Sequence, residues 1–219
     1  EMGKDLGLVQ MYWICAVNEK GKISQCDPYK ETFFVAAALL QLQQVSCIKM
    51  KDSKIFINGF LPNDKKYLSS LYEWIKENSP VKMTKLIDKF TMSFSGKKLD
   101  ELERAVASSL IDGDYVRTIT TGVFHQRERL VPTTESIEGV ICELKEELLQ
   151  GDVLRKDMVA LVSLCYQAGF LKKYLTKQEV QQVKGFLKTM KESKEQNQIR
   201  KMLDYTDSML ALCTVAAVI

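Results

Sequence analysis

Apolar residues recur along most of this chain at intervals of three and four positions, which is the spacing of one face of an α-helix. The spacing predicts four amphipathic helices, whose apolar stripes span residues 67–75, 99–110, 137–148 and 180–190. Residues 33–42 are apolar on nearly every side, and a helix without a polar face is normally buried at the centre of a domain.

Other local patterns extend this prediction. Residues 84–90 and 158–170 are predicted to be helical, and the stretch 93–98 is predicted to be a loop. Thr176 and Glu179 have capping-box spacing, in which each side chain accepts a hydrogen bond from the other's backbone N–H, so a helix is expected to begin there. Trp13 and Trp74 lie in apolar segments, and we expect them to be core or half-buried anchors.

Two segments have the alternation of β-hairpins. Residues 48–50 and 55–57 alternate on both sides of a tight polar break, which predicts a hairpin. Further along, residues 116–120 are rich in β-formers, Thr121-Gly122 suits a turn, and residues 123–131 are expected to form the returning strand.

The predicted order of elements contains no alternation of strand and helix of the kind that builds a parallel sheet, and no linker divides the chain. We therefore expect a mainly α fold, a single globular helical domain over residues 1–219 with two short β-hairpins. Residues 191–219 are expected to end in a C-terminal helix that is peripheral to this domain. Two interpretations of its apolar run 209–219 remain open: a helix packed on the core, or a tail inserted into a membrane or a partner.

Composition narrows the class of protein. A chain of 219 residues with 46% hydrophobic and 27% charged residues is sufficient for a core without metal or disulfide bonds. The chain has 31 basic and 28 acidic residues and a net charge of +3. This balance is too even for a protein that binds nucleic acid by its overall positive charge. None of the six cysteines forms a C-x-x-C pair, and no signal peptide is evident. Buried free thiols and a cytoplasmic location, peripheral at the inner membrane face, are expected.

Signals of catalysis are few. His125 is the only histidine, so a pair of histidine metal ligands is excluded, and no cysteine has the context of a nucleophile. Neither a G-x-G-x-x-G nor a Walker sequence occurs. We expect no enzyme activity, no catalytic residues, no cofactor and no metal.

The basic residues suggest a binding function with two interpretations. One is an anionic membrane surface, because lysines beside exposed aromatic residues combine electrostatic attraction with insertion. The other is a solvated helix face with its apolar stripe in the core. The residues concerned are Lys82, Lys85, Lys89, Lys97 and Lys98, interleaved with Phe90, Met92 and Phe94.

A nucleic-acid-binding winged helix is an alternative. The predicted helix at 99–110 is followed by a hairpin that carries Arg117, Arg127 and Arg129, which is the outline of that motif. The same helix carries Asp100 and Glu103, however, whose carboxylates would face phosphates, so nucleic acid is a disfavoured partner.

The order of elements resembles the Golgi phosphoprotein 3 family from about residue 8 to residue 190. Residues 8–21 are similar to the family's opening helix and charged glycine turn, and residues 33–50 to its buried helix and short strand. Residues 110–132 are similar to a later helix end and hairpin, and residues 157–171 to an apolar helix.

The resemblance implies a mainly helical, non-enzymatic domain. Eukaryotic members bind phosphatidylinositol 4-phosphate and act as peripheral Golgi adaptors. Their headgroup residues, one Trp and three basic residues, align here with Cys26, Val35, Asp100 and Glu103, none of which matches. This difference argues against phosphoinositide specificity and is consistent with a divergent bacterial member.

The resemblance also implies two groups of functional residues. Lys97, Lys98 and Arg104 lie near the aligned headgroup site and are expected to bind anionic lipid. The hairpin at 115–131 corresponds to one that mediates self-association in some members, and it carries Arg117, His125, Arg127 and Arg129. The expected partners are therefore anionic lipid headgroups or a membrane surface, a protein partner, and a second copy of the chain. A soluble interaction scaffold is the remaining alternative.

Overall fold

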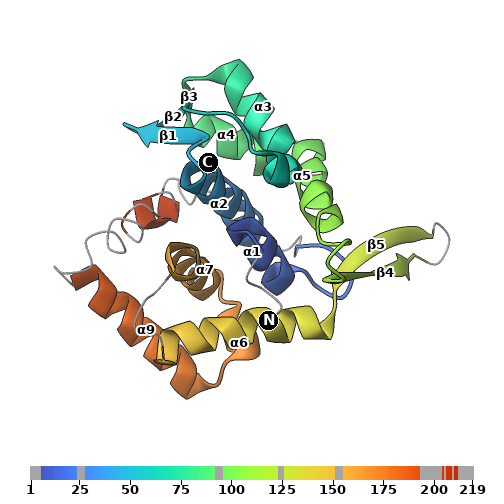
Figure 1. Cartoon of the computed structure of the whole chain (residues 1–219), viewed down its shortest axis with the longest axis vertical. Coiled ribbons are helices and arrows are strands. Elements are labelled where there is room, and N and C mark those ends of the chain that lie inside the picture. Colours follow the sequence, from blue (N-terminus) through green and yellow to red (C-terminus); the bar gives the residue numbers. More distant parts are fainter. Residues whose placement is uncertain are drawn as a thin grey trace.

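Helices α1 (Leu8–Ala16) and α2 (Pro28–Gln44) form the centre of the computed structural model (Figure 1). Every residue of α1 is buried, and α2 buries an unbroken run from Thr32 to Leu42, so neither helix needs a polar face in its middle. The structure describes residues 6–23, 28–91, 96–122, 126–150, 155–192, 204, 206–208 and 210–211.

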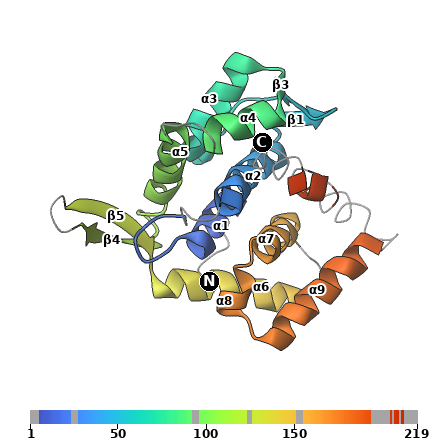
Figure 2. The same cartoon turned by 180° about the vertical axis from the view of Figure 1, so that it is seen from behind.

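The other helices surround this pair in two groups (Figures 1 and 2). The first consists of the 3₁₀ helix η1 (Asn63–Leu68), α3 (Ser69–Asn78), α4 (Met83–Thr91) and α5 (Lys97–Ser108). The second consists of α6 (Thr134–Gln150), α7 (Lys156–Gln167), α8 (Leu171–Tyr174) and α9 (Lys177–Glu192). Helix α1 packs against α5, α6 and α7, so both groups share one core. The expected mainly α domain with short hairpins is confirmed.

The first predicted hairpin is present. Strands β1 (Ile48–Lys51) and β2 (Lys54–Ile57) pair antiparallel, and Asp52 and Ser53 between them both have positive φ, 51° and 57°. Two such residues make a two-residue turn whose twist matches the strands. A two-residue strand, β3 (Val81–Lys82), extends the sheet in the order β1-β2-β3. It is too short to have a pattern of its own in the sequence.

The second hairpin has a longer loop than predicted. Strands β4 (Val116–Thr121) and β5 (Arg127–Pro132) pair from Val116 opposite Pro132 to Thr121 opposite Arg127. Thr121 is therefore the last residue of a strand, so the predicted turn at Thr121-Gly122 is wrong at its first residue, and residues 123–125, where the return was predicted to begin, are not described. His125 lies outside the described residues.

Helix α7 ends earlier than its apolar pattern predicts. Gly169 adopts a left-handed conformation with φ 75°, and its N–H donates to the carbonyl of Tyr166, while the N–H of Phe170 donates to that of Cys165. These two bonds form a Schellman motif, which closes a helix. The predicted cap at Thr176 is confirmed, because its N–H donates to Glu179 at 2.7 Å and the Glu179 N–H donates to its hydroxyl at 3.2 Å.

For the residues that the structure describes, it supports the interpretation of the lysine-rich segment as a solvated helix face with its apolar stripe in the core. Phe90 is fully buried, with its ring 5.9 Å from that of Trp74 in an edge-to-face contact. It is therefore not an exposed aromatic that could insert into a membrane. The predicted loop at 93–98 is wrong at its end, because Lys97 and Lys98 form the first turn of α5. Met92 and Phe94 lie outside the described residues.

Most of the stretch 191–219 also lies outside the described residues. Within it, Leu210 is buried, and Asp207 accepts a hydrogen bond from Gln167 of α7 at 3.1 Å. In the described ranges, no helix is both long and apolar enough to cross a membrane.

The cysteines are free thiols where they are described. Cys15, Cys47 and Cys165 are buried, as expected, whereas Cys142 is exposed on α6. Cys26 and Cys213 lie outside the described ranges.

Candidate functional site

A cleft of about 650 Å³ opens between helix α5 and strand β5. Trp13 of α1 and Gly21 of the following turn also line it. Among the described residues that line its walls, six are charged: Asp100, Glu103, Arg104, Arg127, Glu128 and Arg129. Three carboxylates and three guanidinium groups therefore share one concave surface.

The helical repeat of α5 explains the first wall. Glu103 and Arg104 lie three and four positions after Asp100, and Ala107 lies four and three positions after them, so the four share the face that lines the cleft. The neighbouring stripe of this helix, formed by Leu99, Leu102 and Val106, is apolar and buried in the core. The core packing of α5 therefore points these polar side chains into the cleft.

Gly21 allows the turn after α1 to approach β5. Its φ is 69°, and a Cβ atom at this position would lie 2.8 Å from the carbonyl oxygen of Leu130. Val17 and Ile23 form a β-bridge that closes this turn. A side chain at position 21 would push the turn away from β5 and change the shape of the cleft.

Glu103 is a largely buried acid in the cleft. Its carboxylate accepts a hydrogen bond from the backbone N–H of Ile23 at 3.2 Å. Its pKa is raised to about 7, chiefly because burial desolvates the carboxylate and in part because of the nearby charge of Asp100. The bond from Ile23, the indole of Trp13 and the charge of Lys22 act in the opposite direction. Near neutral pH, Glu103 is therefore present in both protonation states.

Trp13 provides a buried donor at the same place. Its side chain is 1% exposed, and its Nε1 makes no well-aligned hydrogen bond to any described residue. The indole is close enough to the Glu103 carboxyl to lower that group's pKa. The indole N–H therefore favours the ionised form of Glu103, and it is already directed at an acceptor inside the protein.

The arginines supply the positive charge. Arg127 and Arg129 are two positions apart on β5, so their side chains leave the strand on the same face, and Arg104 comes from α5. In the part of the chain that is described, none of the three has a carboxylate within 4.0 Å. They remain available for an anion.

Comparison with known families agrees with this architecture. The sequence profile of the Golgi phosphoprotein 3 family, GPP34, matches residues 9–206. This chain belongs to the Golgi phosphoprotein 3 family. Among curated proteins, no sequence matches it significantly. The matched range includes α1 from its second residue, and all of α5 and β5, which line the cleft.

The fold brings together residues that the sequence places in two groups. Arg104 was expected to bind lipid and Arg127 and Arg129 to lie in a self-association hairpin, but all three line one cleft. Lys97 and Lys98 lie in the first turn of α5 outside this lining, and Lys98 is 3.6 Å from Glu101.

Arg117 is exposed on β4 and does not line the cleft. Of the positions aligned with the family's headgroup residues, Asp100 and Glu103 do line it, whereas Val35 is buried inside α2. Trp13 and Gly21 were not predicted as site residues. The helical spacing of 100, 103 and 104 is the one sequence signal for this wall.

A second cleft, of about 590 Å³, is lined by residues of α1, α2 and η1 and is a weaker candidate for a ligand-binding site. Its most buried polar side chain, Gln41, accepts from the N–H of Val9 at 2.9 Å and donates to the hydroxyl of Tyr67 at 2.5 Å. Gln10 is paired in the same way with Gly7 and Ser109. Because these amides already have partners, they contribute to stability rather than to a ligand site.

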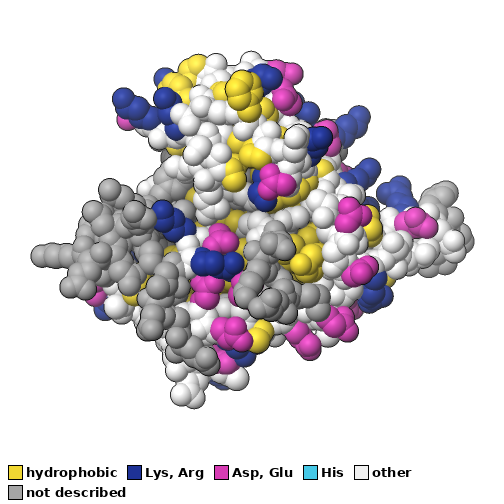
Figure 3. Space-filling model, in the orientation of Figure 1, with side chains coloured by type: hydrophobic (Ala, Val, Ile, Leu, Met, Phe, Trp, Pro, Cys, Tyr) yellow, Lys and Arg dark blue, Asp and Glu magenta, His cyan; other side chains and the backbone are white. Residues whose placement is uncertain are grey.

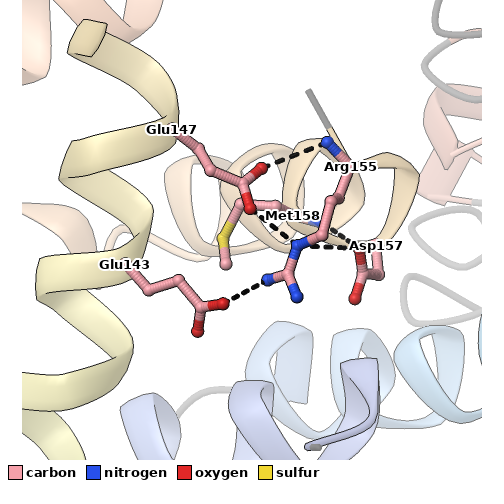
Figure 4. A network of polar contacts seen from close by, with 5 residues as sticks. All are labelled: Glu143, Glu147, Arg155, Asp157 and Met158. Atoms are coloured by element: carbon pink, nitrogen blue, oxygen red, sulfur yellow. Dashed lines mark hydrogen bonds and ion pairs between the residues drawn. The ribbon is translucent and has the colours of Figure 1, made fainter. Parts of the chain in front are cut away.

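A polar network around Arg155 connects α6 with the start of α7 (Figure 4). Its guanidinium group donates to Glu147 at 2.6 Å and to Glu143 at 2.6 Å, and its backbone N–H donates to Glu147 at 3.1 Å. Burial raises the pKa of Glu143, and the charge of Arg155 opposes this shift. The network is therefore a clamp between two helices, in which the second oxygen of Glu143, Oε2, is buried without a hydrogen-bond partner among the described residues.

Proposed function

We propose that this chain is a non-enzymatic, peripheral membrane-binding domain whose cleft between α5 and β5 holds the phosphate-bearing headgroup of an anionic lipid. The observation that supports this most is the convergence of Arg104, Arg127 and Arg129 on one cleft, all without ion pairs among the described residues. Membership of the Golgi phosphoprotein 3 family is consistent with it.

The chemistry of the cleft favours a phosphate group. The planar guanidinium group of arginine donates two parallel hydrogen bonds to phosphate oxygens, and three such groups line this cleft. The carboxylates of Asp100, Glu103 and Glu128 repel a ligand, and they repel a doubly charged phosphate group more strongly than a singly charged one. We therefore expect a singly charged phosphodiester to be accepted as well as a phosphomonoester, without selectivity for phosphatidylinositol 4-phosphate.

The test separates binding in the cleft from adsorption to a bilayer. Water-soluble, short-chain phosphatidylserine, kept below its micelle concentration, is titrated into the protein by calorimetry. Saturable binding is expected, and the variant Arg127→Glu/Arg129→Glu is expected to lose it. Lys184→Glu/Lys188→Glu on the exposed face of α9 makes the same change in net charge and is expected to bind normally. Equal binding by both variants, or no binding by the natural chain, would contradict the proposal.

Self-association through the hairpin is a second candidate function. Strands β4 and β5 form a two-stranded sheet that projects from the helices (Figure 1), so each strand has one edge that pairs with no other described strand. Such an edge can add a strand from a second copy of the chain. Sedimentation is expected to show a concentration-dependent dimer that Thr118→Lys/Thr120→Lys weakens. A monomer at all concentrations would exclude it.

A further inference from the structure

We propose that the outer face of the β1–β2–β3 sheet is a second membrane-binding surface, which attaches the protein to anionic bilayers by charge and acts independently of the cleft. The inference shares with the proposed function only the kind of partner. It uses different residues on a different side of the molecule.

The strand register places the lysines on one face. Residues directly opposite one another in antiparallel strands point to the same side of a sheet. Lys51 is opposite Lys54, and Lys54 is in turn opposite Lys82, so the three form a row across all three strands. Lys49, two positions before Lys51, shares this face.

The other face of the sheet is committed to the core. Ile48, Ile55 and Val81 are buried there, so the lysine face must be the outer one. All four lysines are exposed. In Figure 3, which has the orientation of Figure 1, Lys and Arg side chains gather at the upper left, where β1 and β2 lie.

Repulsion among the lysines of this row destabilises the protein when no partner is bound. Like charges directly opposite one another on a sheet repel. Among the described residues, no carboxylate lies within 4.0 Å of any of the four ammonium groups. The one acidic residue in the segment 48–57 is Asp52, which is in the turn. An anionic partner would relieve this repulsion.

An exposed aromatic side chain lies immediately after the sheet. Phe60 is 93% exposed, three residues beyond the end of β2. Its backbone is held on both sides, because the hydroxyl of Tyr72 donates to the carbonyl of Gly59 at 2.9 Å and the thiol of Cys47 donates to that of Phe60 at 3.2 Å. The ring is thus presented to solvent from a fixed backbone, as a side chain that inserts at a membrane interface would be.

The chemistry of this face favours a bilayer over nucleic acid. Its cations are all lysines, which act as compact point charges without the planar fork that arginine offers to individual phosphates. Lysines near an anionic bilayer strengthen binding by roughly fivefold each. The sheet and the β4–β5 hairpin lie on different sides of α1 and α2 in both views (Figures 1 and 2), so contact at this sheet does not require the cleft.

The decisive experiment is flotation with vesicles of phosphatidylcholine, alone or mixed with phosphatidylserine. The natural chain is expected to bind the mixed vesicles in a salt-sensitive manner. Lys51→Glu/Lys82→Glu is expected to weaken this binding by roughly 25-fold or more, from the loss of two lysines. Lys184→Glu/Lys188→Glu is the matched control and is expected to bind normally. Phe60→Ser is expected to remove the binding that persists at high salt.

The variant Lys51→Glu/Lys82→Glu is chosen so that a loss of vesicle binding cannot be caused by unfolding. It leaves Lys54 between two acidic side chains, so the melting temperature is expected to stay the same or rise. Calorimetry with short-chain phosphatidylserine is expected to be unaffected by this variant, which separates the sheet from the cleft. Unchanged vesicle binding by Lys51→Glu/Lys82→Glu would overturn the inference. So would tighter binding of a single-stranded oligonucleotide than of vesicles through the same lysines.

Discussion

The carboxylate of Glu103 accepts a hydrogen bond from the backbone N–H of Ile23, which lies 80 positions earlier in the chain. This bond joins α5 to the glycine turn that follows α1, and it lies at the wall of the cleft. The burial that makes the bond possible also raises the pKa of Glu103 to about 7. Two predictions depend on this one side chain.

The first concerns stability. Because the pKa of Glu103 is higher in the folded chain than its ordinary value of 4.5, the protonated form stabilises the fold below about pH 4.5, and this contribution is lost as pH rises through about 7. The shift corresponds to on the order of 3 kcal/mol. Glu103→Gln keeps an acceptor for Ile23, so we expect it to be more stable than the natural chain at pH 8 and to show a flatter profile in urea unfolding. Glu101→Gln, on the exposed side of α5, is the control. Identical pH profiles for the natural chain and Glu103→Gln would refute the assignment.

The second concerns ligand binding. An anion in the cleft is repelled by ionised Glu103 and Asp100, while Lys22 attracts it. Protonation of Glu103 removes one of these repulsions, so binding of short-chain phosphatidylserine is expected to be several-fold tighter at pH 6 than at pH 8. In Glu103→Gln this difference is expected to disappear. Calorimetry at both pH values provides the measurement, and a pH dependence that survives in the variant would point to another group.

The Arg155 clamp predicts a large effect of a residue outside the cleft. Arg155→Met would leave the carboxylates of Glu143 and Glu147 close together and partly buried without their cation. We expect a loss of about 2 kcal/mol in the free energy of unfolding, between the values for exposed and buried ion pairs. Adding Glu143→Gln/Glu147→Gln is expected to recover part of it. Lys76→Met removes an exposed pair with Glu73 and should cost less than about 0.5 kcal/mol. Similar losses for Arg155→Met and Lys76→Met would show that the network contributes little.

Gln41 predicts the cost of a buried amide. Gln41→Leu would remove the acceptor of the Val9 N–H, which is buried at the start of α1, and the partner of the Tyr67 hydroxyl. A loss of about 2 to 3 kcal/mol is expected from these unsatisfied groups. Gln44→Leu, one turn further along α2 and exposed, should be nearly neutral. Chemical denaturation of the two variants compares them directly. An unaffected Gln41→Leu would mean that water replaces the lost partners.

Local features of the chain were predictable because neighbouring residues determine them. The stripe in α5, the tight turn at Asp52-Ser53 and the cap formed by Thr176 and Glu179 each depend on side chains within a few positions. Predictions failed where a distant or single-residue effect decided the result. Gly169 ended α7 before its apolar run was complete, and the ring of Trp74 covered Phe90.

The sequence by itself determined the helical class, the hairpins and the family resemblance, since periodicity and turn chemistry are carried by adjacent residues. Only the tertiary structure decided that Arg104 meets Arg127 and Arg129 beside Trp13, and that three lysines of three strands form one row. These juxtapositions follow from how apolar stripes far apart in the chain pack together. That packing depends on the shape of the whole core, which no local window of residues contains.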